Sequence, residues 1–391
     1  MGSGWSRSAR LLRDGPGSHV GALASADVAA ATLLTGRKQD RFLVARRGAV
    51  RLLAVFDGHS PAGQTGGAEE AELAAAHFGG LLQGKAIMAL LAGDASADPG
   101  APSAQLGTAI TSFFVDYQRE REAAYDEHIR VPLLAEKARL EAEINDTVQL
   151  ELPLEGGTTA TAVLSTPDYT LCAFVGDSEA IIARFSDDGV ATAVPLTPRR
   201  HQPSDEAEAA RVQQQRGTVL SGGVLYVSGA QGGLRVTRSL GDCAFHGIGI
   251  LSAEPEIHVL PRTPADAFLI IGSDGLWEGV CFDRAIEVAS CSLRGCGKGG
   301  LKAALVEARQ ALFLEASERQ SHVDDVVVVI AVLNAEHPFY RSSTSTTAST
   351  STTASTSPSP AARTACESFY LSVSQQQPVG GDIAQAETDQ P

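Results

Sequence analysis

Aspartates stand directly beside the most apolar segments of this chain. Asp57, Asp177 and Asp274 each follow an apolar run within two residues, and the pair Asp324-Asp325 directly precedes another. Any one Asp-Gly after a strand is also a common turn. Four such positions favour a shared site, because strands of one compact sandwich end at common edges. Carboxylates that converge at such an edge repel one another unless protons or cations neutralise them.

The chemistry available to such a site is that of a hard divalent cation. Carboxylate and carbonyl oxygens with water suit Mg²⁺ or Mn²⁺, whereas zinc draws more often on His and Cys. Gly58 and Gly275 follow two of the aspartates, and a missing side chain lets the backbone approach a metal, so that the Gly58 carbonyl can itself be a ligand. A carboxylate bridging two ions about 3.5 to 4 Å apart lets them activate a shared water against phosphorus. The pattern therefore predicts a magnesium or manganese site that hydrolyses phosphate esters.

The elements that must position these acids form an α+β pattern. Runs rich in β-branched and aliphatic residues predict strands at Leu52–Phe56, Thr159–Leu164, Tyr169–Val175, Ala180–Phe185, Ala267–Gly272 and Val326–Leu333. A 3.6-residue repeat predicts helices at Glu69–Leu82, Ala104–Arg121, Leu134–Asn145, Asp205–Arg216 and Lys302–Ser317. Between residues 159 and 185 the strands follow each other too closely for a crossover helix, which predicts antiparallel pairing there. We expect helices packed outside antiparallel sheets.

Composition excludes several classes of protein. The 391 residues carry a formal net charge of −15, which disfavours a nucleic-acid binder because affinity for phosphate backbones comes mainly from cationic side chains. An apolar content of 43% excludes a wholly disordered chain. The longest strongly apolar stretch, residues 326–333, falls far short of the roughly 20 residues that a membrane-spanning helix needs. Six cysteines without a C-x-x-C pair do not indicate a zinc site or a disulfide framework.

The two ends of the chain differ from its middle. Residues 1–16 contain Gly2 and Ser6 in the pattern for N-myristoylation, followed by Arg7, Arg10 and Arg13, which predicts peripheral membrane contact. A mobile polar start and a short organellar transit peptide are the alternatives. Residues 17–336 are predicted to fold, and residues 337–391 to form a disordered Ser/Thr-rich linker and tail. We expect a cytoplasmic or nuclear protein, with membrane association if the N-terminus is acylated.

The motifs around these acids resemble those of the metal-dependent protein serine/threonine phosphatases of type 2C. They occur in the family's order and cover nearly all of the predicted folded region. The matching segments are Val55–His59, Gly156–Ala160, Val175–Ser178, Arg238–Asp242, Glu254–Glu256, Ser273–Glu278 and Asp324-Asp325.

The resemblance implies a sandwich of two antiparallel β-sheets flanked by helices, with two Mg²⁺ or Mn²⁺ ions at one edge. It implies that the main metal ligands are Asp57 as the bridge, the Gly58 carbonyl, Asp274 and Asp324, and that Asp177 binds a weaker third ion. His59 matches the proposed general acid, a task that suits an imidazole. A structural turn histidine is the alternative. Phosphoproteins are the implied substrates, and we expect a monomer.

Three departures from the family pattern bear on the site. Gln39-Asp40 stands where many members carry two acids, so Asp40 keeps its carboxylate while Gln39 offers a neutral oxygen to the second metal. Arg37, or else Lys38, is the nearest match to the phosphate-binding arginine, with a solvated basic turn as the alternative. Arg200 replaces an aspartate that relatives usually have, and could recruit acidic substrate or be an exposed charge.

The leading hypothesis is therefore a hydrolase of phosphoserine and phosphothreonine in proteins. The alternative is a catalytically weak or silent family member that acts as a regulatory binding module. The Arg37, Gln39 and Arg200 departures motivate this alternative, whereas the presence of every acid expected to bind the main metals opposes it.

Overall fold

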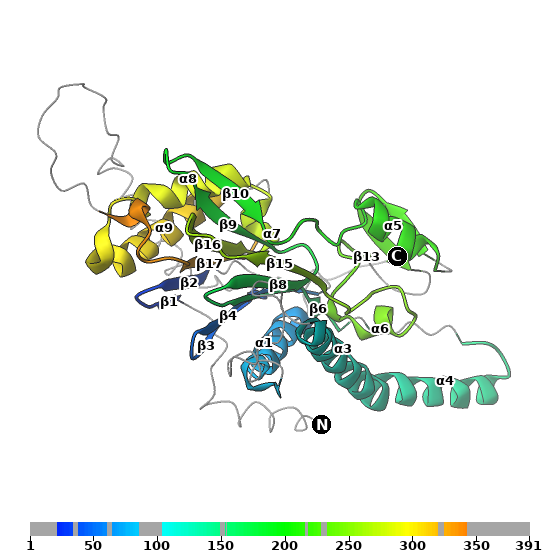
Figure 1. Cartoon of the computed structure of the whole chain (residues 1–391). Helices are drawn as coiled ribbons and strands as arrows, with labels where there is room; N and C mark the ends of the chain where they lie inside the picture. The colour runs from blue at the N-terminus through cyan, green and yellow to red at the C-terminus, as the bar shows by residue number, and fades with distance from the viewer. Residues whose placement is uncertain are drawn as a thin grey trace, which may run out of the picture. The chain divides into compact units, whose positions relative to one another are not determined.

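The computed structural model describes residues 22–33, 38–60, 65–85, 104–148, 153, 155–215, 218–227, 233–319 and 324–341. Its centre is a pair of antiparallel sheets (Figure 1). The six-stranded sheet has the order β1 (Ala22–Ala24), β2 (Val28–Leu33), β17 (Val326–Val332), β16 (Asp266–Gly272), β9 (Glu179–Phe185) and β10 (Ala191–Pro195). The five-stranded sheet has the order β15 (Glu256–Pro261), β8 (Tyr169–Val175), β7 (Ala160–Ser165), β4 (Val50–Phe56) and β3 (Arg41–Arg47).

The core between the two sheets is built from alternate side chains of both. Phe42, Val55 and Phe174 from the five-stranded sheet and Ile182 and Ile271 from the six-stranded sheet belong to one buried cluster. Because side chains of a strand alternate between faces, the other residues of each strand point outward, where they need a second cover. This requirement explains why these strands are buried along nearly their whole length, as in β16.

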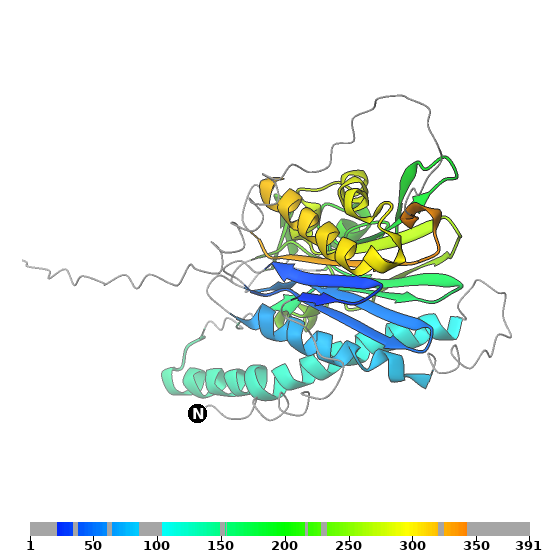
Figure 2. The ribbon, with the colours of Figure 1, turned by 90° about the vertical axis from the view of Figure 1, so that its left-hand side faces the viewer.

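Helices supply that second cover (Figure 2). The six-stranded sheet packs against α8 (Phe282–Leu293) and α9 (Gly297–Arg319), whose buried faces share a cluster with Ile181, Ile270 and Val328. The five-stranded sheet packs against α1 (Gly66–Phe78) and the first part of α3 (Ala104–Tyr125). The predicted fold class, a sandwich of two antiparallel sheets flanked by helices, is confirmed.

Smaller elements surround the sandwich. One short sheet consists of β11 (Thr218–Ser221), β12 (Val224–Val227) and β13 (Gly233–Leu234), and a second consists of β14 (Leu240–Gly241), β6 (Gly157–Thr158) and β5 (Gly58–His59). Further helices are α5 (Glu206–Gln213), α6 (Cys243–His246) and α7 (Asp274–Trp277), with short helical turns at Leu81–Gln83 and Pro338–Tyr340. No helix among the described residues has the length and hydropathy needed to cross a membrane.

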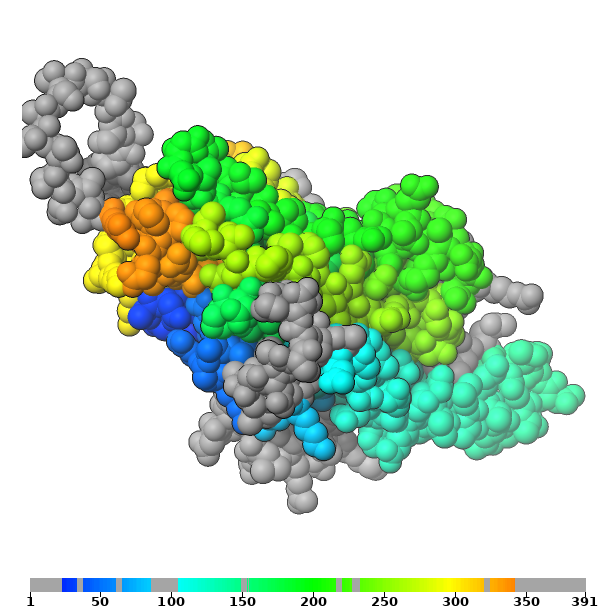
Figure 3. Space-filling view, viewed as in Figure 1, coloured from blue at the N-terminus to red at the C-terminus, as the bar shows by residue number. Residues whose placement is uncertain are grey.

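The helix α3 continues past the sheets. A π-helical turn, Asp126–Arg130, joins it to α4 (Val131–Ile144), and the backbone stays helical through both junctions. No residue of α4 is buried, and in the space-filling view it forms a surface of its own beyond the sheets (Figure 3). The predicted helix at Leu134–Asn145 is confirmed, and it carries ion pairs such as Arg139 to Glu143.

The six predicted strands and five predicted helices are all present, but one predicted pairing is wrong. β7 and β8 form an antiparallel hairpin. β9 does not pair with β8, since it joins the other sheet between β16 and β10. Gly176, at φ +96°, lets the chain turn sharply from one sheet to the other. The segment that carries Asp177 is therefore a crossing between the sheets rather than a hairpin turn.

Candidate metal centre

Strand registers bring the acidic positions to one edge of the sandwich. Arg41, at the start of β3, lies opposite Phe56 at the end of β4, so Asp40 and Asp57 share that edge. In the other sheet Gly272, at the end of β16, lies opposite Val328 near the start of β17, which places Asp274 and Asp324 together. The short crossing from β8 to β9 joins the two edges at Asp177.

The aspartates at this edge act on one another electrostatically. Burial, followed by repulsion from Asp325 and Asp274, holds the pKa of Asp40 well above its usual range. Burial and then repulsion from Asp40 and Asp274 do the same to the pKa of Asp57. Burial and the neighbouring Asp177 raise the pKa of Asp274 to about 7. A buried group of carboxylates that raise each other's pKa is stabilised by any cation that enters it.

Hydrogen bonds tie the site's loops together across the two sheets. The backbone N–H of Gln39 donates to Asp325 Oδ2 at 2.6 Å, linking the start of β3 to the start of β17. The Gln39 side-chain amide donates to Ser60 Oγ. The backbone N–H of Asp57 donates to Thr159 Oγ1 at 3.1 Å, and Thr159 Oγ1 is bonded to Ser178 Oγ at 2.8 Å. These contacts fix the backbone that carries the acids, independently of any ion.

Gly58 lies where the backbone is most crowded. A Cβ on this residue would stand 2.4 Å from the Gly67 carbonyl oxygen and 2.6 Å from the Gln39 carbonyl oxygen. Backbone atoms cannot yield as a flexible side chain could, so only glycine fits. The position therefore serves the close approach of the Gly67 and Gln39 backbone. The predicted role of the Gly58 carbonyl as a metal ligand stays a prediction.

The residues at this edge have the chemistry that the implied Mg²⁺ or Mn²⁺ ions need. Asp40 is 2% exposed, and its Oδ2 is buried without a hydrogen-bond partner, which is costly for an ionised oxygen unless a cation meets it. The surrounding donors are all oxygens, as Mg²⁺ and Mn²⁺ prefer. Within the described residues no three His, Cys, Asp or Glu side chains lie close enough together to hold a metal ion as they are placed. The donor set fits these ions, although the carboxylates do not form a closed cage.

His59 lies beside the aspartates rather than in a plain turn. Its Nε2 is 2.7 Å from Asp242 Oδ2, and 24% of its side chain is exposed. Burial lowers the pKa of His59, but the charges of Asp242, Asp177 and Asp274 outweigh burial and raise the pKa overall. An imidazole that keeps its proton beside buried acids, and is itself 24% exposed, can act as a proton donor.

Arg200 forms an ion pair within the chain, while the recruitment of acidic substrate considered for it from sequence stays a prediction. Its side chain is 30% exposed and pairs with Glu179 at 2.5 Å. Its charge and a hydrogen bond from Gln202 Nε2 to Asp177 Oδ2 at 2.8 Å both lower the pKa of Asp177, although burial raises it overall. Arg200 therefore contributes positive potential to the site from an ion pair. Arg37 lies outside the described residues, while Lys38 is exposed with a left-handed backbone at φ +56°.

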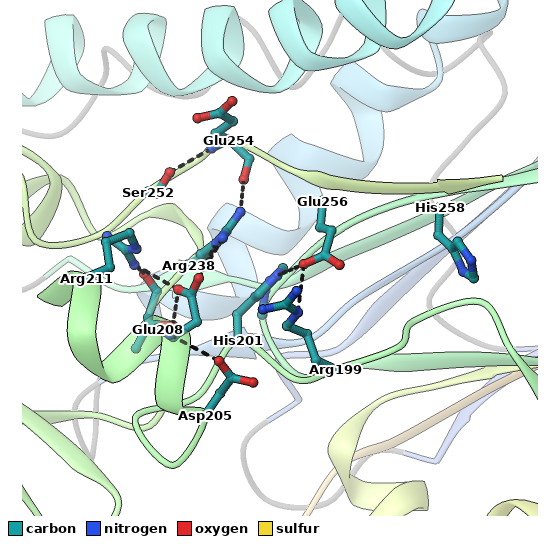
Figure 4. Close-up of polar contacts among 12 residues, drawn as sticks. Arg199, His201, Asp205, Glu208, Arg211, Arg238, Ser252, Glu254, Glu256 and His258 are labelled. Atoms are coloured by element: carbon teal, nitrogen blue, oxygen red, sulfur yellow. Dashed lines mark hydrogen bonds and ion pairs between the residues drawn. The ribbon is translucent and has the colours of Figure 1, made fainter. Parts of the chain in front are cut away.

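A second polar cluster lies beside α5 (Figure 4). Glu208 is 2% exposed and accepts hydrogen bonds from Arg238, Arg211 and the hydroxyl of Thr237. These contacts outweigh burial, so the pKa of Glu208 falls to about 2. The cluster anchors α5 to the segment that leads into β14. Sequence reasoning gave Glu208 no role, because its partners come from segments far apart in the chain.

A buried histidine completes this support. His201 stacks on Phe174 with the rings nearly parallel at 4.8 Å, and the backbone N–H of Gly176 donates to its Nδ1 at 3.2 Å. Burial and the nearby Arg238 lower the pKa of His201 to about 3. His201 is thus a neutral side chain that holds the sheet crossing in place.

The two-sheet sandwich with acids gathered at one edge defines the class of this domain, an α+β sandwich flanked by helices. Comparison with known proteins gives its family. The family model described as Protein phosphatase 2C matches residues 114–321, more than half of the chain. The chain belongs to the protein phosphatase 2C family, as its motifs predict.

Individual relatives cover parts of the chain. It is 31% identical to Probable protein phosphatase 2C 57 of Oryza sativa subsp. japonica over 229 residues, which is 57% of this chain and 55% of the relative. It is 37% identical to Protein phosphatase 2C 37 of Arabidopsis thaliana over 145 residues, 37% of this chain and 33% of the relative. The matches thus span about a third to about a half of these relatives' lengths.

A solved structure shares the fold. The crystal structure of serine-threonine phosphatase 2C from Toxoplasma gondii aligns with a TM-score of 0.57 at 17% identity, covering 81% of this chain and 99% of that one. At this identity the match concerns the fold alone.

Proposed function

We propose that this protein removes phosphate from phosphoserine and phosphothreonine in proteins, using Mg²⁺ or Mn²⁺. The observation that carries the proposal is the meeting of Asp40, Asp57, Asp177 and Asp274 at one edge of the sandwich, where burial and the repulsion between these acids raise the pKa values of Asp40, Asp57 and Asp274. Family membership supports the same activity.

In the proposed mechanism, Asp57, the Gly58 carbonyl, Asp274 and Asp324 would hold two ions with the help of Asp40, and Asp177 would hold a weaker third. Bound ions of this kind supply Lewis acidity and lower the pKa of a shared water. The chain's own contribution is to orient the phosphate next to His59. His59 gives a proton to the serine or threonine oxygen as its bond to phosphorus breaks, because an alkoxide is a poor leaving group.

The test is turnover of a phosphothreonine peptide by purified full-length protein. We expect activity with Mn²⁺ or Mg²⁺ and none in excess EDTA, restored by adding back metal. Equal rates with and without EDTA would end the proposal. Titration calorimetry with Mn²⁺ distinguishes a silent binding module, since binding of Mn²⁺ without turnover of any phosphopeptide would favour a regulatory role over an enzyme.

We also propose that the N-terminus carries a myristoyl group at Gly2 and contacts membranes. Residues 1–21 lie outside the described part of the chain, so this proposal depends on sequence alone. An intact mass of protein made in its native cell should exceed the unmodified mass by one myristoyl group. Without that increase, the membrane proposal is wrong.

A further inference from the structure

Asp242 is the nearest partner of His59, and no role follows for it from the sequence. Its Oδ2 lies 2.7 Å from His59 Nε2 and accepts a second hydrogen bond, also 2.7 Å, from Ser239 Oγ. The Asp242 side chain is 4% exposed. A carboxylate with so little access to water satisfies its charge almost wholly through these two contacts.

This contact determines which nitrogen of His59 faces the reaction. An ionised carboxylate only accepts hydrogen bonds, so Nε2 must carry the hydrogen between the two residues. Nδ1 is then the nitrogen that can release a proton to a leaving group. The arrangement has the logic of other His–Asp pairs, in which a buried carboxylate orients the ring while the opposite nitrogen does the chemistry.

The fold holds Asp242 in a conformation that it would not adopt alone. Its backbone is left-handed at φ 43° and ψ 41°, which is uncommon for a residue with a side chain. Its N–H donates to the Gly156 carbonyl at 2.9 Å. Gly157 leaves room for its carboxylate, since a Cβ there would lie 2.1 Å from Oδ2.

The residue before Asp242 is clamped by helix α3. Gln118 Nε2 donates to the Gly241 carbonyl at 2.9 Å, and Gln118 Oε1 accepts from the Gly241 N–H at 2.8 Å. Gln118 is 4% exposed, so both bonds are shielded from water. One amide side chain thus fixes both polar groups of Gly241, whose own φ is +78°.

We propose that Asp242, held by the Gln118 clamp on Gly241, is the positioning residue that aims His59 at the leaving group. The inference rests on the proposed phosphatase activity. In the step concerned, water oxygen bonds to phosphorus, the bond from phosphorus to the threonine oxygen breaks, and that oxygen takes the proton from His59 Nδ1. The attacking water supplies the proton that restores His59, so the products are the free hydroxyl and inorganic phosphate.

Two substrates separate positioning from general damage. A phosphothreonine peptide releases an alkoxide that needs a proton, whereas p-nitrophenyl phosphate releases a stable phenolate that does not. General acids contribute about 10²- to 10⁴-fold, and Asp242→Asn keeps His59 while losing part of its alignment. We expect kcat for the peptide to fall about 10- to 100-fold, with a much smaller fall for p-nitrophenyl phosphate. Asp187→Asn, an exposed change after β9, is the matched control and should leave both rates alone.

The outcomes distinguish this inference from the proposed function. If the unaltered protein with Mn²⁺ hydrolyses neither substrate, the proposed function itself fails. If it hydrolyses both and Asp242→Asn lowers both rates equally, Asp242 is merely structural and the inference is overturned. Unchanged rates for Asp242→Asn would overturn it as well.

A spectroscopic measurement covers the case in which Asp242→Asn folds poorly. In the metal-free ¹⁵N-labelled protein, with His59→Gln used for assignment, His59 should show an Nε2-bound hydrogen in a strong hydrogen bond. Gln118→Met preserves side-chain length but removes both bonds to Gly241, so it should shift or broaden this signal and lower the peptide rate more than the p-nitrophenyl phosphate rate. An unchanged signal together with an unchanged rate ratio in Gln118→Met would refute the clamp.

Discussion

The raised pKa of Asp274 makes a quantitative prediction about the metal-free protein. Between the ordinary pKa of 3.8 and about 7, the native state keeps a proton that the unfolded chain has lost. Stability must therefore fall as pH rises through this window, by about 1.36 kcal/mol for each pH unit. From pH 5 to pH 7 this amounts to about 2.7 kcal/mol, which solvent screening of a partly exposed side chain reduces to about 2 kcal/mol.

Comparison with Asp274→Asn removes this contribution together with the part of the raised pKa of Asp40 and Asp57 that Asp274 causes, and the two effects on stability have the same sign. Two buried histidines also change stability with pH. The pKa of His201 is lowered to about 3 and that of His246 to about 4, so both stabilise the native state increasingly as pH rises toward 6.5. This effect is the same in the variant and in the unaltered protein. The assay is urea unfolding in EDTA at pH 5 and pH 8, followed by fluorescence of Trp277, which is 5% exposed. From pH 5 to pH 8 the free energy of unfolding of the variant should rise by about 2 kcal/mol relative to that of the unaltered protein.

Metal should restore the stability that the unaltered protein loses at pH 8. Excess Mn²⁺ at about 100 times its dissociation constant adds about 2.7 kcal/mol to a protein that binds it when folded, and Asp274→Asn should gain less. The refuting result is measured in EDTA. If the variant's advantage in free energy of unfolding over the unaltered protein stays constant or shrinks from pH 5 to pH 8, Asp274 is not in a cluster of acids that repel one another.

Three further predictions concern other parts of the site. Asp57→Asn should abolish metal-dependent turnover while leaving circular dichroism unchanged, and full activity would refute its role. Gly58→Ala should lower the free energy of unfolding by about 1 to 3 kcal/mol through overpacking against Gly67 and Gln39, and an unchanged urea midpoint would contradict this crowding. Glu208→Gln should lower the free energy of unfolding by about 3 to 5 kcal/mol, because it leaves arginines unpaired. Most of this loss should be seen at pH 5 and above and little near pH 2, because the pKa of Glu208 is about 2. A loss of stability that does not depend on pH would contradict the ion network.

The arrangement of the acids could be predicted from sequence because it follows from local rules. Apolar runs such as Phe268–Ile271 identify buried strands, and an aspartate at a strand end lies at a sheet edge. The strand β2 could not be predicted in this way, since its sequence, Val-Ala-Ala-Ala-Thr-Leu, favours a helix and only pairing with β1 and β17 makes it a strand. Helix α8 does carry a usable signal that the prediction omitted, with buried residues at Ala285, Ile286, Ala289 and Leu293.

Contacts between distant segments explain what the sequence does not reveal. Asp242 and His59 are 183 residues apart in the chain, and no spacing rule pairs them. The ion pair of Arg200 with Glu179 could not be predicted either, because the two residues lie 21 positions apart and no spacing rule pairs them. The crossing of the chain from one sheet at β8 to the other at β9 likewise depends on which strands are available as partners. The short link at Gly176 does not determine this choice.

The proposed catalytic residues do not lie at the opposite edge of the sandwich, where β3 and β9 end. There, the tight turns after β3 and β9 carry exposed glycines, Gly48 and Gly189, and a Cβ on Gly189 would meet nothing within 4 Å. Extra residues in such turns lengthen a surface loop at little entropic cost. A peptide epitope or fluorescent reporter inserted at residue 189 should therefore leave catalysis unaffected, whereas one residue inserted within β4 would reverse the faces of its side chains and displace Asp57.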